Sequence, residues 1–169
     1  MWCSDRRGLL SLALAGLALA GCGFRPLYGE GSPAAAMRGR FVLETPDGQP
    51  GFEMRERLLE RLGPADQPVY RLSVRLDLDT EGSALTQQDY TTRYDVSGMA
   101  RYEVLPLAGG APVLTGTVTS ATAYSAPEGD SSSAFASLVA GRDAEVRVAR
   151  AMADQIVMEL AVTAGDRAP

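Results

Sequence analysis

The chain has 169 residues, which is enough for one domain with a core of its own. Its formal net charge is -5, and its 16 basic residues are all arginines, with no lysine and no histidine. An acidic balance argues against a nucleic-acid-binding protein. The absence of histidine removes the usual general base near neutral pH, the Ser-His-Asp arrangement and the commonest metal ligand.

The first 21 residues have the layout of an export signal. Arg6 and Arg7 precede an apolar run over residues 9–20, which is shorter than the roughly 20 residues that a membrane span needs. The arginine pair leaves twin-arginine export open. We favour general secretion, because Asp5 precedes the pair and leucines follow it. Residues 1–21 are therefore expected to be a cleaved signal peptide.

The predicted signal ends at Leu19-Ala20-Gly21-Cys22, which resembles a bacterial lipobox. In proteins with this motif the peptidase cuts between the residues that are Gly21 and Cys22 here, and the cysteine carries acyl chains on its thiol and its amine. Each buried CH₂ contributes about 0.8 kcal/mol, so several chains hold a protein stably on a bilayer. The alternative is an ordinary signal followed by an unmodified cysteine. Gly23, in place of an aspartate, favours the outer membrane.

The mature chain is expected to have three parts. Residues 22–39 are rich in glycine, proline and alanine, which predicts a lipidated N-terminus and a flexible tether. One folded domain is expected over residues 40–163, followed by a C-terminal tail over residues 164–169.

The folded domain is expected to begin with a strand over residues 40–46 and a helix over residues 52–62. The helix is predicted to end at Gly63-Pro64. Spacing places one group of residues on its buried face, with Met54 and Leu58 beside it. This group is Phe52, Arg55, Leu59 and Leu62.

Three strands follow. Apolar residues alternate with polar ones over residues 70–78 and again over residues 93–104, which is typical of strands with one buried face. A turn at residues 106–112 precedes a third strand, rich in threonine and valine, over residues 113–124. Short turns between successive strands predict an antiparallel meander.

The last predicted element is a helix over about residues 134–163, with Ser131, Ser132 and Ser133 as candidate N-caps. Its apolar stripe comprises Val146, Ala149, Ala153, Ile156 and Leu160. The element order is then β-α-β-β-β-α. The predicted fold class is α+β, a two-layer sandwich of a mostly antiparallel four-stranded sheet with both helices on one face.

Four arginines are candidates for binding an anionic glycolipid on the polar face of the sheet, since guanidinium groups bind phosphate in bidentate fashion. They are Arg71, Arg75, Arg93 and Arg101. The alternative is that each of them pairs with an acid on the same face. The acids available there are Asp77, Asp95 and Glu103.

Catalytic and metal chemistry have little support. Asp77, Asp79 and Glu81 have the spacing of a calcium-binding turn, but a solvated strand end is the favoured interpretation. Any two acids can meet in space, although Glu44 and Glu159 show no catalytic signal. We expect a protein that is not an enzyme and has no cofactor apart from the lipid on Cys22.

Three segments resemble the family of the LPS-assembly lipoprotein LptE, in the form seen in alphaproteobacteria. They are "GCGFRPLYG", "YDVSGMARYEV" and "SSSAFASLVAGRDAEVRVARAMADQIVMEL". The resemblance runs from about residue 19 to residue 160. It implies the same sandwich fold and a non-catalytic protein that lies in the lumen of the outer-membrane β-barrel LptD, on the periplasmic side, and contacts lipopolysaccharide. The alternatives are a general outer-membrane adaptor, or a pilot protein for another envelope pore, and a lipid-anchored enzyme.

Overall fold

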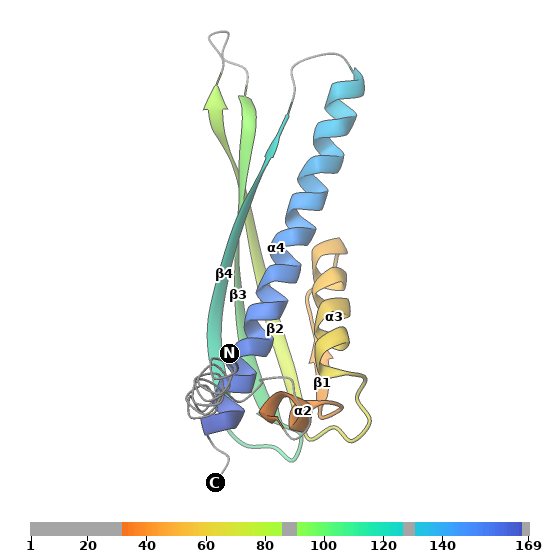
Figure 1. Cartoon of the computed structure of the whole chain (residues 1–169), viewed down its shortest axis with the longest axis vertical. Coiled ribbons are helices and arrows are strands. Elements are labelled where there is room, and N and C mark those ends of the chain that lie inside the picture. Colours follow the sequence, from red (N-terminus) through yellow and green to blue (C-terminus); the bar gives the residue numbers. More distant parts are fainter. Residues whose placement is uncertain (1–31, 86–90, 127–130, 167–169) are drawn as a thin grey trace, which may run out of the picture.

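The computed structural model describes residues 32–85, 91–126 and 131–166 (Figure 1). The predicted signal peptide, its cleavage site and Cys22 lie outside these residues. The described elements, in chain order, are α2 (Pro33–Met37), β1 (Phe41–Glu44), α3 (Gln49–Leu62), β2 (Tyr70–Leu85), β3 (Thr91–Pro106), β4 (Leu114–Ser125) and α4 (Ser131–Asp166). Helix α4 therefore includes the first three residues of the segment predicted as a tail.

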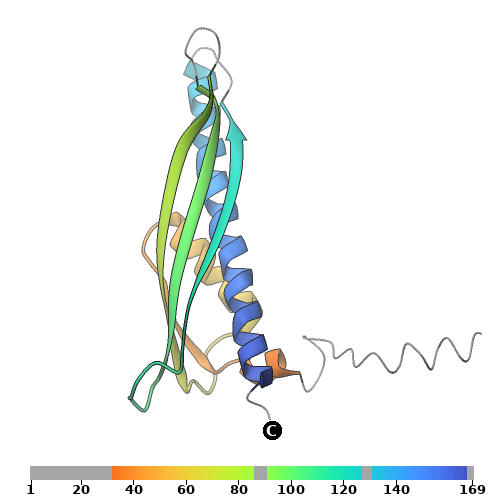
Figure 2. The same ribbon diagram turned by 90° about the vertical axis from the view of Figure 1, so that its left-hand side faces the viewer.

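The four strands form one mixed sheet in the order β1-β2-β3-β4. Strands β2, β3 and β4 pair antiparallel as the predicted meander, whereas β1 pairs parallel to β2. A parallel pair needs a crossover, and α3 supplies it between β1 and β2. Helices α3 and α4 lie on the same face of the sheet (Figures 1 and 2). The predicted α+β sandwich with both helices on one face is confirmed.

The molecule is long and narrow because its main elements are long. Helix α4 has 36 residues and β2 and β3 have 16 each, so each is about 50 Å long. Helix α3 has only 14 residues, about 21 Å, and accompanies one half of α4. We call the end at which β1 starts and β3 ends the base, and the opposite end the distal end. Among the described residues, no helix combines the length and apolar character needed to cross a bilayer.

The core lies between the sheet and the two helices. Inward-facing side chains of β2 and β3 alternate with exposed ones as predicted, with Leu72, Val96 and Ala100 fully buried. Helix α4 is buried against the sheet and against α3 at the same time. Four residues of its predicted stripe are buried: Ala149, Ala153, Ile156 and Leu160. Val146, the fifth, is only half-buried.

The predicted buried face of α3 is only partly correct, because Leu62 is buried as expected whereas Met54 and Leu58, expected beside the face, lie at its centre. Phe52 is 58% exposed, and the buried stripe is Gly51, Met54, Leu58 and Leu62. The helix begins at Gln49, three residues before the predicted start. Its first turn also packs so closely on the preceding loop that a Cβ on Gly51 would lie 1.9 Å from the carbonyl oxygen of Pro46. Met54, rather than Phe52, lies in the core.

Part of the segment predicted as a tether is folded. Ser32 caps α2 by accepting a hydrogen bond from the amide of Ala35 at 3.1 Å. Met37 is buried at 8% exposure, and α2 packs against α4. The amide of Gly39 then donates to the carbonyl of Leu62 at 2.7 Å. Residues 32–40 are therefore folded at the base, before the first strand begins.

Candidate functional site

The four candidate arginines all lie exposed on the solvent face of the sheet, opposite the helices, but they do not form one group. Arg75 on β2 is the register partner of Arg101 on β3, and Arg71 lies four residues, about 13 Å, closer to the base along β2. Arg93 lies eight residues from Arg101 along β3, about 26 Å away. The sheet thus brings three of them toward the basal half and leaves Arg93 near the distal end.

Two of these arginines have acidic partners. Arg71 Nε lies 3.1 Å from Glu44 Oε1 on β1, and Arg93 Nε lies 3.5 Å from Asp95 Oδ1. For Arg93, this supports the alternative that the arginine pairs with an acid on the same face, because its partner is Asp95. Glu44 gave no sequence signal, because the parallel pairing of β1 with β2 was not predictable from local pattern. Both pairs are about half exposed, and such pairs contribute about 0–1 kcal/mol.

Arg75 and Arg101 face each other without such neutralisation. Within the described ranges, no carboxylate lies within ion-pair distance of either guanidinium. Thr117 of β4 is the next residue in the same cross-strand row. Like charges directly opposite each other on a sheet repel. The row Arg75–Arg101–Thr117 is therefore the strongest anion-binding geometry on this face.

The other half of the solvent face is acidic. Asp77 and Asp79 line an open depression of about 480 Å³ together with Met99 and residues of β4. Over the part of the chain that the structure describes, no group of three acidic or sulfur-bearing side chains could hold a metal ion, so the calcium interpretation gains no support. The sheet face consequently changes from basic to acidic between the base and the distal end.

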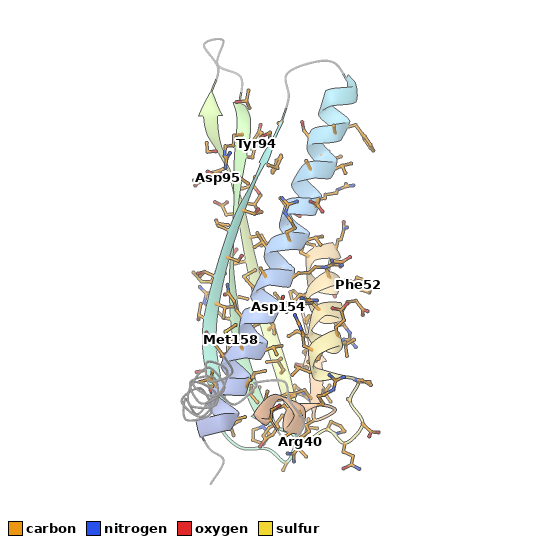
Figure 3. All side chains as sticks on the ribbon, viewed as in Figure 1. Arg40, Phe52, Tyr94, Asp95, Asp154 and Met158 are labelled. Carbon is orange, nitrogen blue, oxygen red and sulfur yellow. The ribbon has the colours of Figure 1, made fainter. Side chains whose placement is uncertain are left out.

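A network of ion pairs joins α3 to α4. Arg57 donates from Nε and Nη2 to both carboxylate oxygens of Asp154 at 2.9–3.2 Å, and Arg61 Nε donates to Oδ1 at 3.0 Å. Arg150 and Glu53 pair at 2.6 Å. Asp154 faces α3 (Figure 3). Partial burial alone would raise the pKa of Asp154, but hydrogen bonds from Arg57 and Arg61 and their charges lower it overall.

A second polar contact joins the sheet to α4. The ring of Tyr102 packs over Gly116 on β4, where a Cβ would lie 2.5 Å from the ring, and its hydroxyl donates a hydrogen bond to Glu159. Burial, together with this hydrogen bond and the charge of Glu159, raises the pKa of Tyr102 well above its ordinary value. A phenol held protonated in this way secures packing, and neither residue lines the depression on the solvent face.

The distal half of α4 exposes apolar side chains that sequence analysis did not single out. Phe135 is 68% exposed, Leu138 51% and Val139 47%. This part of the helix extends beyond α3, so no second helix covers it (Figure 1). Their spacing of three and four residues puts them on one side of the helix. The sequence carries this signal as apolar residues spaced three and four apart at the start of the predicted helix.

Solved structures show where this fold occurs elsewhere. A candidate lipoprotein from Caulobacter crescentus is 19% identical, with a TM-score of 0.63, and the match covers 81% of this chain and 98% of that chain. Rare lipoprotein B from Shewanella oneidensis is 16% identical with a TM-score of 0.53, covering 75% and 97%. A minor lipoprotein from Acinetobacter baumannii is 16% identical with a TM-score of 0.55, covering 74% and 92%.

The chain has their fold. At these identities the similarity establishes the shared architecture and nothing finer. No protein-family model matches the chain, and no curated protein matches its sequence.

Proposed function

We propose that this protein is an outer-membrane lipoprotein, attached through acyl chains on Cys22, that lies in the lumen of an LptD-type β-barrel and assists the transport of lipopolysaccharide to the outer leaflet. The observation that carries the proposal is the fold, which matches nearly the whole length of three lipoproteins. The lipobox and the segments that resemble LptE point in the same direction.

The shape and surface of the sandwich suit this location. A barrel of this class has a polar interior, so its occupant needs charged and hydrogen-bonding surface more than apolar surface. The solvent face of the sheet supplies this with its basic and acidic halves. The distal side of α4, with Phe135 and Leu138 exposed, is the kind of apolar surface that a partner covers in a complex.

Arg75 and Arg101 are the residues that we propose contact lipopolysaccharide. Two opposed guanidinium groups without a carboxylate partner favour a phosphate between them, because the phosphate relieves their mutual repulsion. Arg71, four residues nearer the base on the same face, is assigned a secondary role, since Glu44 holds part of its charge. Arg93 is assigned the weakest role, since it is remote and paired with Asp95.

Copurification tests the partner. The mature protein, extracted in mild detergent, is expected to bring down one large β-barrel in nearly equal amount, identified by mass spectrometry. Recovery only as a free monomer would refute the proposed complex. Recovery with a different envelope pore would instead favour the adaptor alternative. The Cys22→Ala variant is expected to lose the lipid label and to remain uncleaved or soluble, whereas a labelled band in this variant would refute lipidation at that residue.

Binding to purified lipopolysaccharide tests the arginines. Exchanging both Arg75 and Arg101 for glutamate is expected to weaken binding roughly tenfold or more per arginine lost, because a charged hydrogen bond contributes about 1.5–3 kcal/mol. The loss should be largest at low salt. The control is Arg142→Glu, because Arg142 is exposed on α4 and lies away from the solvent face of the sheet. Equal binding by the double variant and the control would show that the opposed arginines do not contact the glycolipid.

A further inference from the structure

Two loops at the base expose apolar side chains next to each other. They are residues 64–69, between α3 and β2, and residues 107–112, between β3 and β4, and every residue in both is exposed. Val69 is 38% exposed and Leu107 42%. The amide of Leu107 donates to the carbonyl of Val69 at 2.9 Å, which fixes the loops side by side. Asp66 is the one charged residue in the two loops, so the pair forms a mainly apolar surface.

Two exposed arginines border this surface. Arg38 follows α2 directly, and Arg40 lies at the base (Figure 3). The carbonyl of Arg40 accepts hydrogen bonds from the amides of Val69 and Tyr70 at 2.9 and 3.1 Å, which places Arg40 against the first loop. Across residues 32–85, 91–126 and 131–166, no carboxylate forms an ion pair with either arginine side chain. Apolar loop tips bordered by guanidinium groups are the composition that binds a membrane interface.

The N-terminal start of the described chain also lies at the base. Ser32 begins the described part of the chain at the base and lies ten residues after Cys22. Ten residues span at most about 35 Å when fully extended. The distal end lies about 50 Å farther along α4. A lipid attached at residue 22 therefore holds the base, and not the distal end, within reach of the bilayer.

We infer that the loops 64–69 and 107–112, with Arg38 and Arg40, form a membrane-contact surface that binds the headgroup region of a bilayer containing anionic lipid. The apolar tips enter the interface and the arginines bind lipid phosphates. This contact, in addition to the acyl chains, sets the long axis of the sandwich upright and directs the distal end away from the lipid. The inference rests on attachment at Cys22 from the proposed function, but not on the barrel partner.

Tryptophan fluorescence tests the contact. The sequence has one tryptophan, Trp2, so a chain beginning at residue 22 has none. This chain keeps the whole buried core, which runs from Met37 to Ala161. With a hexahistidine tag at its start, it attaches to vesicles of phosphatidylethanolamine, phosphatidylglycerol and a nickel-chelating lipid, which replaces the natural acyl chains. The reporter is Leu107→Trp in the second loop, and the matched control is Met99→Trp, exposed on the preceding strand β3 about 26 Å from the base.

Quenching by brominated lipid chains gives the result. Leu107→Trp is expected to shift its emission to the blue and to lose most of its intensity, whereas Met99→Trp keeps its intensity. If neither reporter is quenched, the protein moves freely on its tether and the inference is wrong. If both are quenched equally, the sheet lies flat on the membrane and the inference is also wrong.

The arginines are tested in the Leu107→Trp chain. Exchanging Arg38 and Arg40 for glutamate should remove most of the quenching on vesicles with phosphatidylglycerol, whereas Arg142→Glu at the distal end should not change it. Unchanged quenching in the double variant would refute the role of the two arginines. Because the tag replaces the acyl chains, this assay does not depend on lipidation or on the barrel. A positive result together with failed copurification would therefore refute the proposed function and leave the membrane contact standing.

Discussion

Gly98 on β3 is a position where α4 approaches the sheet closely, and Gly98→Ala tests this packing. A Cβ there would lie 2.6 Å from Val148 Cγ1, 2.8 Å from Leu78 Cδ2 and 2.8 Å from Met152 Cε. Met152 is flexible at its end and can move. Val148 is β-branched and 1% exposed, so it has no other place for its methyl group.

The expected loss in the free energy of unfolding of Gly98→Ala follows from two opposing effects. Overpacking a filled core costs about 1–3 kcal/mol. Replacing glycine within a strand recovers about 0.5–1 kcal/mol of backbone entropy. The middle of each range gives a net loss of about 1 kcal/mol. For a urea m-value of about 1–3 kcal/mol/M, the midpoint of unfolding should fall by roughly a third of a molar to one molar.

Urea unfolding followed by circular dichroism gives the free energy of unfolding of each variant. The control is Ser97→Ala, which lies exposed on the opposite face of the same strand and should stay within about 0.5 kcal/mol of the parent. In a chain that already carries Val148→Ala, Gly98→Ala should cost less than in the parent, because the shortest and most rigid of the three contacts is then removed. A cost that is the same in both backgrounds, or no cost in the parent, would refute the close approach of α4.

Three further predictions follow from the contacts. Asp154→Asn should cost about 1 kcal/mol at neutral pH. Because the folded-state pKa of Asp154 is lowered, the difference should shrink as pH falls below the ordinary value of 3.8 and vanish once pH has fallen through the lowered folded-state pKa. A pH-independent difference in urea titrations would contradict the role of its charge. Tyr102→Phe should cost about 1–2 kcal/mol through the lost charged hydrogen bond, and an unchanged unfolding midpoint would contradict that bond. Met54→Ala should lower the free energy of unfolding by about 2–5 kcal/mol, whereas Phe52→Ser should change it by no more than about 0.5 kcal/mol. A larger loss in Phe52→Ser than in Met54→Ala would show that Phe52 is buried, as the sequence pattern predicted.

The period-two pattern predicted the meander correctly because each strand has one buried face, so inward residues such as Leu72 and Ala100 are visible in the sequence alone. The rotation of α3 was not predictable in the same way. Phe52 and Met54 are both apolar, and only their packing in the folded chain shows that Met54 is buried and Phe52 exposed. Local pattern does not distinguish the two.

The arginines show the same limit at the candidate site. Alternation placed Arg75 and Arg101 on the polar face, but only the register makes them direct neighbours. The partner of Arg71 came from β1, because a parallel pairing depends on a crossover rather than on adjacent sequence. Residues 106–112 were predicted as a turn and Gly63-Pro64 as the end of a helix, whereas the contact of the two loops through Leu107 and Val69 exists only in the folded chain.

The short length of α3 divides the molecule into two zones of unequal stability. Near the base, α4 is enclosed by the sheet and by α3, with Met152 and Ile156 fully buried. Beyond the end of α3, its residues from Ala134 to Val139 rest on one layer only and are largely exposed. Local opening should therefore begin distally, and amide hydrogens there should exchange with solvent sooner than those of the basal half. In the proposed complex, a stable base and a less stable distal end would let the protein adjust its distal end to the barrel without loosening its attachment to the membrane.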